Sequence, residues 1–153
     1  MATINQAAPH SNSTLRSLLS IADRARARLE QELTASGVTF QQYNVLRILA
    51  DAGPEGVPTL EVAERLMERA PGITRLMDRL ELLGFVSRTR GEDRRRVMCA
   101  ITPSGTELVG AVQPAVADIE ESVVRCLNPN ELGALNHFLN RIRGAMKERM
   151  ISQ

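Results

Sequence analysis

The sequence lacks the features that mark membrane proteins and most enzymes. No stretch of its 153 residues approaches the roughly 18 uninterrupted apolar residues of a membrane span, so we expect no membrane partner. The polar N-terminus, residues 1–13, lacks the apolar core of a secretory signal, which predicts a cytoplasmic protein. Paired carboxylates with a histidine, a glycine-rich phosphate loop and a nucleophile motif are also missing, which argues against an enzyme.

Cysteine and histidine are too scattered to predict a metal site. Cys99 and Cys126 do not form a C-x-x-C pair, and neither His10 nor His137 stands at ligand spacing from them. We therefore expect no metal, no cofactor and two reduced, partly buried thiols. A thiol-based redox sensor is an alternative, although no pattern marks either cysteine as an activated thiolate.

Positive charge is concentrated in one short segment. The formal net charge of +1 argues weakly against a protein that coats nucleic acid over its whole surface. Between Val86 and Arg96, however, five arginines accompany only Glu92 and Asp93. A charged run is usually a solvated loop, so its function depends on the elements around it.

Helical spacing of apolar residues predicts two helices in the first third of the chain. The first begins near residues 13–14 and ends at Gly37, a residue that favours helix termination. Thr39 and Gln42 have the spacing of a capping box, which opens the second helix. This second helix is expected to stop before the Gly- and Pro-containing segment 53–56.

A short third helix and a longer fourth helix are predicted next, with a turn at residues 67–69. Thr59 is expected to cap the third helix, whose apolar face comprises Leu60, Ala63 and Leu66, with Val62 beside it. The fourth helix begins around Ala70 or Pro71, because proline is tolerated in a first turn, and Gly84 follows its end. Its apolar stripe comprises Ile73, Leu76, Met77, Leu80 and Leu83.

The apolar period then changes to that of strands. Residues 85–90 and 97–101 are predicted strands, and the basic loop 91–96 joins them. Helix, turn, helix and a hairpin with a basic tip is the order of a winged helix-turn-helix. Thr102 and Pro103 start a fifth helix, and Asn128 and Glu131 start the last one. The buried stripe predicted for the fifth helix is Leu108, Val112, Val116, Ile119 and Val123.

These elements predict a mainly α fold with a small β-hairpin wing. In it, a winged helix-turn-helix domain is joined to a helical dimerisation domain. We assign residues 1–12 to a flexible N-terminal arm, residues 13–36 and 103–153 to the helical dimerisation region, and residues 37–102 to the DNA-binding domain.

The fourth helix is predicted to be the recognition helix. When its apolar stripe faces inward, Pro71, Thr74, Arg75 and Asp78 lie on the opposite side, with Arg79 on the flank. Because the N-terminal part of such a helix enters the major groove, Arg75 is expected to bind guanine or a phosphate. For an isolated helix, the simpler interpretation would be solvated charges.

The basic loop is predicted to be the wing. At least one of its arginines is expected to enter a neighbouring minor groove, where negative potential attracts arginine. Asp93 is expected to accept hydrogen bonds from Arg95 and so fix its direction. The predicted contacts with double-stranded DNA are Thr59, Arg69, Ala70, Pro71, Gly72, Thr74, Arg75, Asp78, Arg79, Arg90, Asp93, Arg94, Arg95 and Arg96.

The segments ITRLMDRLE (73–81), GFV (84–86), DRR (93–95) and ITPSG (101–105) resemble the MarR family of bacterial transcriptional regulators. The resemblance implies a triangular homodimer that reads a pseudopalindromic site, with the first and last helices and part of the fifth interlocked around the two-fold axis. It assigns Asp93 and Arg95 to the wing, and it assigns residues 70–75 to the base-facing start of the recognition helix. Pro71 and Gly72 depart from the polar residues more usual there.

The resemblance also implies regulation by a small aromatic or phenolic effector. In the family, such acids commonly bind between the dimer helices and the winged domain and release DNA. Other members sense oxidants through a cysteine near the N-terminus, which this chain lacks. Tyr43, Arg16 and His137 are pocket candidates, with an ordinary core-edge tyrosine and two surface side chains as the alternative.

The terminal helices indicate a dimer independently of the resemblance, because each is long and apolar on one side. The predicted interface residues are Leu15, Leu18, Leu19, Leu132, Leu135, Leu139, Ile142 and Met146. The predicted function is sequence-specific DNA binding as a transcriptional repressor that a ligand releases. The alternative from another class is a winged-helix module for protein association, whose arginines meet an acidic partner.

Overall fold

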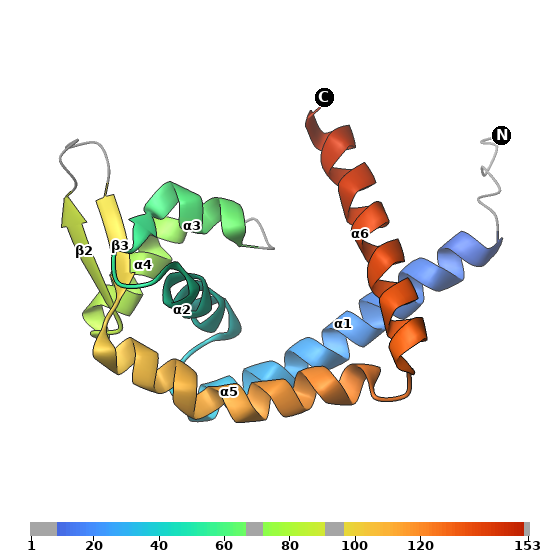
Figure 1. Cartoon of the computed structure of the whole chain (residues 1–153), viewed down its shortest axis with the longest axis horizontal. Helices are drawn as coiled ribbons and strands as arrows, with labels where there is room; N and C mark the ends of the chain where they lie inside the picture. Colours follow the sequence, from blue (N-terminus) through green and yellow to red (C-terminus); the bar gives the residue numbers. More distant parts are fainter. Residues whose placement is uncertain (1–8, 67–71, 91–96, 152–153) are drawn as a thin grey trace, which may run out of the picture.

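The computed structural model describes residues 9–66, 72–90 and 97–151. Within these ranges the chain is mainly helical with a small antiparallel sheet, as predicted (Figure 1). The elements are α1 (Pro9–Ala35), α2 (Phe40–Ala52), β1 (Val57–Pro58), α3 (Thr59–Arg65), α4 (Ile73–Leu82), β2 (Val86–Arg90), β3 (Val97–Ile101), α5 (Pro103–Val124) and α6 (Pro129–Ile151). Across the described segments, no helix is both long and apolar enough to cross a membrane.

Local signals set several helix ends as predicted. Thr39 and Gln42 form the capping box of α2, with bonds of 2.9 and 3.2 Å between each side chain and the other residue's amide. At α6 the Glu131 side chain accepts from the Asn128 amide at 2.9 Å, and the Asn128 side chain accepts from the Glu131 amide at 3.0 Å. Gly84 follows α4 with a φ of 76°. The side-chain bonds at the starts of α2 and α6 satisfy amides that have no hydrogen-bond partner inside the helix.

Two apolar clusters form the core. One lies where α2, α3 and α4 meet the sheet, and the other joins α1 and α2 to α5. The first comprises Val45, Leu46, Leu49, Val57, Val62, Met77, Leu80, Val86 and Cys99. The second comprises Leu29, Leu33, Val38, Tyr43, Val112, Val116 and Ile119. The winged domain therefore has its own core, and a second core fixes it to the long helices.

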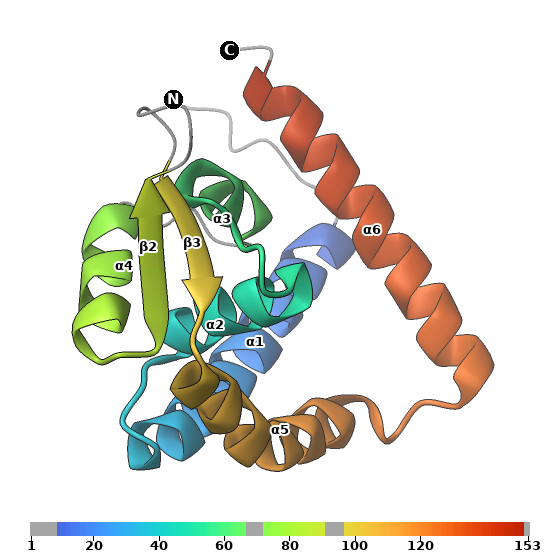
Figure 2. The ribbon, with the colours of Figure 1, turned by 60° about the vertical axis from the view of Figure 1, so that its left-hand side comes forward.

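The sheet has the strand order β1-β3-β2, with both pairings antiparallel. The β2–β3 hairpin runs from the Val86–Ile101 pair to the Arg90–Val97 pair, at the ends of the predicted wing loop. Figure 2 shows α4 running alongside β2, so the predicted recognition helix and the wing strands are neighbours. Strand β1 was not predicted, because two residues are too few to show an alternating pattern.

Two predicted helix starts were wrong. Helix α1 begins at Pro9 and not near residues 13–14; a proline is tolerated in a first turn, and the polar residues that follow it carry no apolar signal. The remaining arm, residues 1–8, lies outside the described residues. Helix α4 begins at Ile73, since Gly72 has a φ of 99°, in the left-handed region. The predicted turn at 67–69 lies outside the described residues.

The predicted cap of α3 was also wrong, as was Leu60 in its predicted apolar face, whereas Ala63 and Leu66 are half-buried as predicted. The N-cap is Pro58, and Thr59 is the first helical residue; its hydroxyl donates to the Val97 carbonyl at 3.4 Å instead of capping. The Thr59 hydroxyl is therefore bonded to β3 and not to a backbone amide of its own helix. Leu60 is 72% exposed, whereas Val62 is fully buried. A similar error concerns α5, where the predicted core residue Val123 is exposed near the helix end.

The start of α5 is tied to the turn between α4 and β2. The Thr102 hydroxyl accepts from the Gly105 amide at 3.1 Å and donates to the Gly84 carbonyl at 2.6 Å. The Thr102 amide donates to the Phe85 carbonyl at 3.0 Å. A Cβ on Gly105 would lie 2.4 Å from the Phe85 oxygen, so only glycine fits there. This junction couples the winged domain to the long helix.

Replacement by alanine is expected to change the free energy of unfolding in opposite directions at two glycines of α5. Gly105→Ala should lower the free energy of unfolding by about 2 kcal/mol, because the new methyl group overlaps backbone. Gly110→Ala should raise it by about 0.5–1 kcal/mol, because Gly110 has nothing within 4 Å and alanine favours a helix. Urea denaturation followed by circular dichroism measures both. Equal effects would contradict the close contact at Gly105.

Candidate nucleic-acid interface

Helix α4 has a buried apolar face and an exposed polar face. Met77 and Leu80 are fully buried, and Ile73 and Leu76 are half-buried against the same core. Within residues 73–80 the exposed side chains are Thr74, Arg75, Asp78 and Arg79. The inward and outward faces predicted from the apolar period are therefore confirmed for residues 73–80. Gly72, directly before the helix, has no side chain to separate its backbone from a bound molecule.

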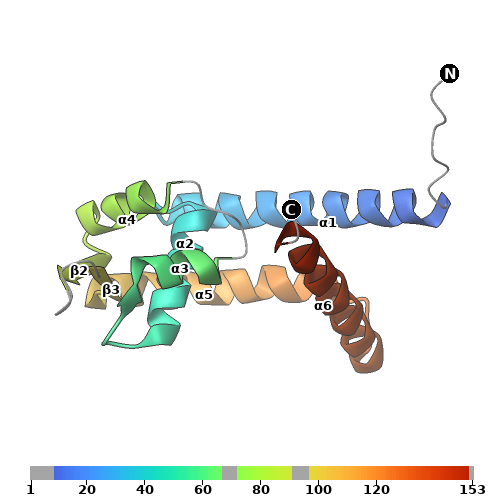
Figure 3. The same ribbon diagram turned by 90° about the horizontal axis from the view of Figure 1, so that it is seen from above.

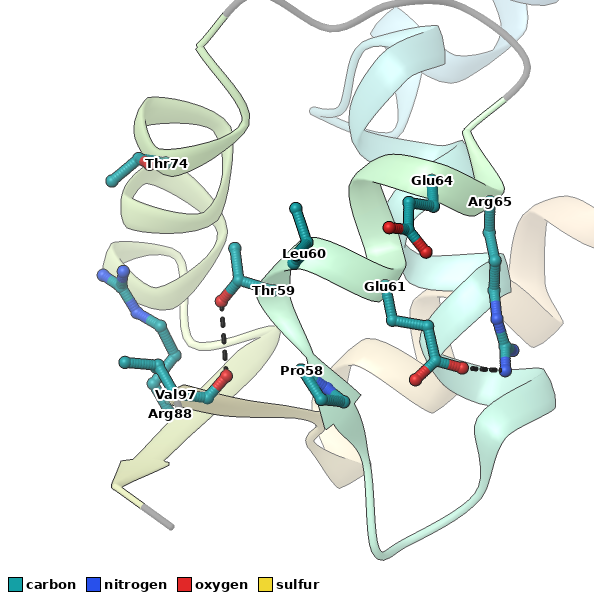
Figure 4. A pocket seen from close by; sticks show the side chains of 9 residues that line it. All are labelled: Pro58, Thr59, Leu60, Glu61, Glu64, Arg65, Thr74, Arg88 and Val97. Carbon is teal, nitrogen blue, oxygen red and sulfur yellow. Dashed lines mark hydrogen bonds and ion pairs between the residues drawn. The ribbon is translucent and has the colours of Figure 1, made fainter. Parts of the chain in front are cut away.

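Predicted contact residues of α3 and α4 border one open recess between α3, α4 and the sheet (Figure 4). Thr59 lies at its centre, fixed to Val97 of β3, and Thr74 lies across the recess on α4. Glu61 pairs with Arg65 within α3 on the other side. The recess is lined by Pro58, Thr59, Leu60, Glu61, Glu64, Arg65, Thr74, Arg88 and Val97. The structure thus brings Thr59 and Thr74 to a common surface.

Arg88 is a residue of this surface to which the sequence assigned no role. Its Nε donates to Glu81 Oε2 at 2.8 Å, and its Nη2 donates to Asp78 Oδ1 and to Glu81 Oε2, both at 2.5 Å. The hydrogen bonds to Glu81 and then to Asp78 raise the pKa of Arg88 above its ordinary value. Asp78, predicted to meet DNA, is therefore ion-paired with β2 while remaining 55% exposed. The only sequence signal was the alternation that places Arg88 on the same strand face as buried Val86.

Half of the predicted contact set lies outside the described residues. These residues are Arg69, Ala70, Pro71, Asp93, Arg94, Arg95 and Arg96. Arg90 is the last residue of β2 and pairs with Val97, the first residue of β3. The hairpin therefore delivers both ends of the arginine-rich loop to one end of the sheet, beside α4.

Cys99 belongs to the core of the winged domain. Its side chain is fully buried, and its Sγ lies 3.1 Å from the Thr59 hydroxyl. Burial raises the pKa of the Cys99 thiol, which disfavours the reactive thiolate. Cys126, two residues after the end of α5, is exposed, so the prediction of a partly buried thiol was wrong for this residue. A redox role for Cys99 is therefore not supported by its surroundings.

The three pocket candidates have different environments. Tyr43 is buried in the α1–α2–α5 core, and its hydroxyl donates to Gln113 Oε1 at 2.9 Å. Burial raises the pKa of Tyr43, so the phenol stays neutral and has its hydrogen-bond partner inside the protein. Arg16 and His137 are exposed on α1 and α6. Tyr43 thus fits the alternative interpretation, a core tyrosine.

The predicted dimer residues form exposed apolar faces on the two terminal helices. Helix α6 projects from the end of α5, away from the sheet (Figures 1 and 3). Leu18, Leu132 and Leu135 are half-buried. The exposed members are Leu15, Leu19, Leu139, Ile142 and Met146, and Phe138 adds to them on α6. Helix α6 therefore has an exposed apolar face formed by Phe138, Leu139, Ile142 and Met146.

Comparison with known proteins identifies the family. Residues 36–96 match the sequence profile of the MarR family. A helix-turn-helix-type transcriptional regulator of Mycobacterium bovis is 32% identical over 123 residues, which cover 79% of this chain and 85% of that protein. The chain belongs to the MarR family. It is therefore a DNA-binding transcription regulator and not an enzyme.

Solved structures share the MarR-family fold over most of the chain. The S. aureus MepR–DNA complex superimposes with a TM-score of 0.77 at 23% identity, covering 87% of this chain and 96% of MepR. Bordetella bronchiseptica BpsR, whose DNA binding 6-hydroxynicotinic acid regulates, gives a TM-score of 0.74 at 26% identity, covering 86% and 98%. The winged helix-turn-helix fold is thus confirmed.

Proposed function

We propose that this MarR-family protein is a homodimeric repressor that binds a pseudopalindromic operator and releases it when a small ligand binds. The observation that carries the proposal is the exposed polar face of α4, with Thr74, Arg75 and Arg79 held outward by the buried stripe beneath them. A regulator of this kind acts on the chromosome, which in a bacterium lies in the cytoplasm.

The proposed DNA contacts come from two neighbouring elements. Helix α4 enters the major groove with its N-terminal half, so Arg75 meets a base edge or a phosphate and Thr74 meets the backbone or a thymine methyl. The arginines of loop 91–96 reach the adjacent minor groove, with Asp93 directing Arg95. Thr59, at the start of α3, lies on the same surface for a phosphate contact.

The proposed dimer buries the apolar faces of α1 and α6. A two-fold interface uses the same patch on both subunits, so each copy of α6 would cover the Leu139, Ile142 and Met146 side chains of the other. Residues 13–36 and 103–153 then form the dimerisation region, and residues 37–102 form one DNA-binding head per subunit. Two heads double the phosphate contacts and read two half-sites.

The proposed effector is a small aromatic or phenolic acid. Support comes from BpsR, a relative of similar fold whose DNA binding responds to 6-hydroxynicotinic acid. The repressor mode requires that the ligand bind the DNA-free form more tightly, because a ligand with equal affinity for both forms shifts no equilibrium. Calorimetric titration with such acids, in the presence and absence of operator, tests this part.

Arg75→Ala is expected to weaken operator binding by about tenfold or more, because a base or phosphate contact of arginine contributes about 1–3 kcal/mol. Fluorescence anisotropy with a fragment from the protein's own upstream region measures it, over a series of salt concentrations. Arg47→Ala is the matched control, since Arg47 pairs with Glu120 between α2 and α5. Wild-type protein without nanomolar, salt-sensitive binding to that region would contradict the proposed function.

A further inference from the structure

We propose that Arg88 is a positioning residue that holds the recognition helix α4 at a fixed angle to wing strand β2. The clamp consists of Arg88 of β2 with Asp78 and Glu81 of α4. Its importance for DNA rests on the proposed function, in which α4 and the wing bind two grooves at once. Its existence in the free protein rests on the contacts alone.

The geometry of the clamp fixes the orientation of α4 relative to β2 as well as the distance between them. Glu81 Oε2 accepts from both Nε and Nη2 of Arg88, and Asp78 Oδ1 accepts from the same Nη2. A guanidinium is a rigid planar fork, so three such bonds restrict the rotation of its partners in a way that the point charge of a lysine does not. The Arg88 side chain is only 22% exposed, which limits competition from water.

The clamp adds a polar connection between two elements that the chain joins at one end and that share the apolar core through Met77, Leu80 and Val86. The turn after α4 is held by bonds from the amides of Gly84 and Phe85 to the carbonyls of Glu81 and Leu80. These bonds fix the C-terminal end of α4. Asp78 lies about one helical turn further from that end, so its bond to Arg88 opposes rotation of α4 about the turn.

Neutralising Asp78 and Glu81 is an informative test, because a pure charge effect and loss of the clamp predict opposite changes in DNA affinity. Asp78 belongs to the predicted DNA contacts, and Glu81 is a second exposed negative group next to it on α4. On charge alone, their neutralisation should strengthen binding to a phosphate backbone. If their function is to hold Arg88, neutralisation should weaken binding, because α4 and the wing would no longer be aligned for simultaneous contact.

The test compares Arg88→Gln, the double variant Asp78→Asn/Glu81→Gln, and all three changes combined. Each is expected to bind the operator about tenfold more weakly than wild type, and the triple variant no more weakly than Arg88→Gln. The carboxylate variant should also show a smaller salt dependence, although it loses no positive charge, because misaligned heads contact fewer phosphates. Arg88→Lys should recover only part of the affinity. Arg47→Gln is the control for loss of an arginine distant from α4.

Hydrogen exchange of the DNA-free protein tests the clamp without reference to function. Backbone amides of α4 and β2 should exchange severalfold faster in Arg88→Gln and in the carboxylate variant, while those of α1 and α5 keep their rates. Unchanged exchange in both variants would overturn the clamp itself. Operator binding by the carboxylate variant that equals or exceeds wild type would overturn its role in positioning. Absence of specific binding by wild type, with faster exchange in the variants, would contradict the proposed function and leave the clamp supported.

Discussion

An aspartate in place of Ile142 is expected to convert the proposed dimer into monomers and to lower operator affinity more than about 100-fold. Ile142 lies on the exposed apolar face of α6, with 47% of its surface accessible in the single chain. A two-fold interface would bring two copies of the substituted residue close to each other. Each carboxylate would lose its hydration and repel the other.

The matched control is Asn140→Asp, which adds the same charge two residues earlier on α6. At about 100° per residue, this position lies roughly 200° around the helix from Ile142, on the face that contains no dimer residue. Sedimentation velocity at micromolar concentration distinguishes monomer from dimer, and anisotropy with the operator fragment measures affinity. We expect Ile142→Asp to sediment as a monomer and Asn140→Asp to sediment as a dimer. A dimeric Ile142→Asp would show that the apolar face of α6 has another function.

The loss of affinity would follow from the loss of one head. A single α4 and a single wing read one half-site, with half of the phosphate contacts. Circular dichroism should show that the monomer keeps the helical content of α1–α5, because the two core clusters are built from these elements and the sheet and contain no residue of α6. This separation of folding from assembly makes the interpretation direct: binding would be lost without loss of the winged domain.

Features that depend on near neighbours in the chain were predictable. The capping boxes at Thr39 and Asn128 involve residues three positions apart, and the stripe of α4 repeats within two turns. Their physical basis is local: a free amide needs an acceptor, and an apolar face needs a core. The outward orientation of Thr74 and Arg75 followed from the same stripe, so this part of the candidate interface was predictable as well.

Features that depend on distant segments were not predictable. Thr59 has the sequence signature of a cap, yet its hydroxyl bonds to Val97, 38 residues away. Arg88 could be counted as a charge, but its partners on α4 appear only when β2 folds back along the helix. Strand β1 depends entirely on β3, since the two residues that form it carry no pattern of their own.

Gly56 explains how a strand of two residues can form at all. Its φ of 67° turns the chain, and a Cβ at this position would lie 2.3 Å from the carbonyl oxygen of Cys99 and 3.0 Å from the Cβ of Ala100. The next residue, Val57, pairs with Cys99 in the sheet. The backbone at Gly56 thus lies directly against β3, where no side chain has room.

Gly56→Ala is therefore expected to lower the free energy of unfolding by about 3–5 kcal/mol, with a fall in Tm of about 10 °C. The cost has two parts: a left-handed conformation unfavourable for alanine, and overlap with the backbone of β3. Gly37→Ala isolates the first part, because Gly37 has a φ of 79° and nothing within 4 Å, so its cost should be about 1 kcal/mol. Thermal and urea denaturation of both variants measure the difference.

Since β3 also carries one end of the wing, Gly56→Ala should weaken operator binding even at temperatures where the protein stays folded, whereas Gly37→Ala should not. Equal stability of the two variants would contradict the close contact between Gly56 and β3.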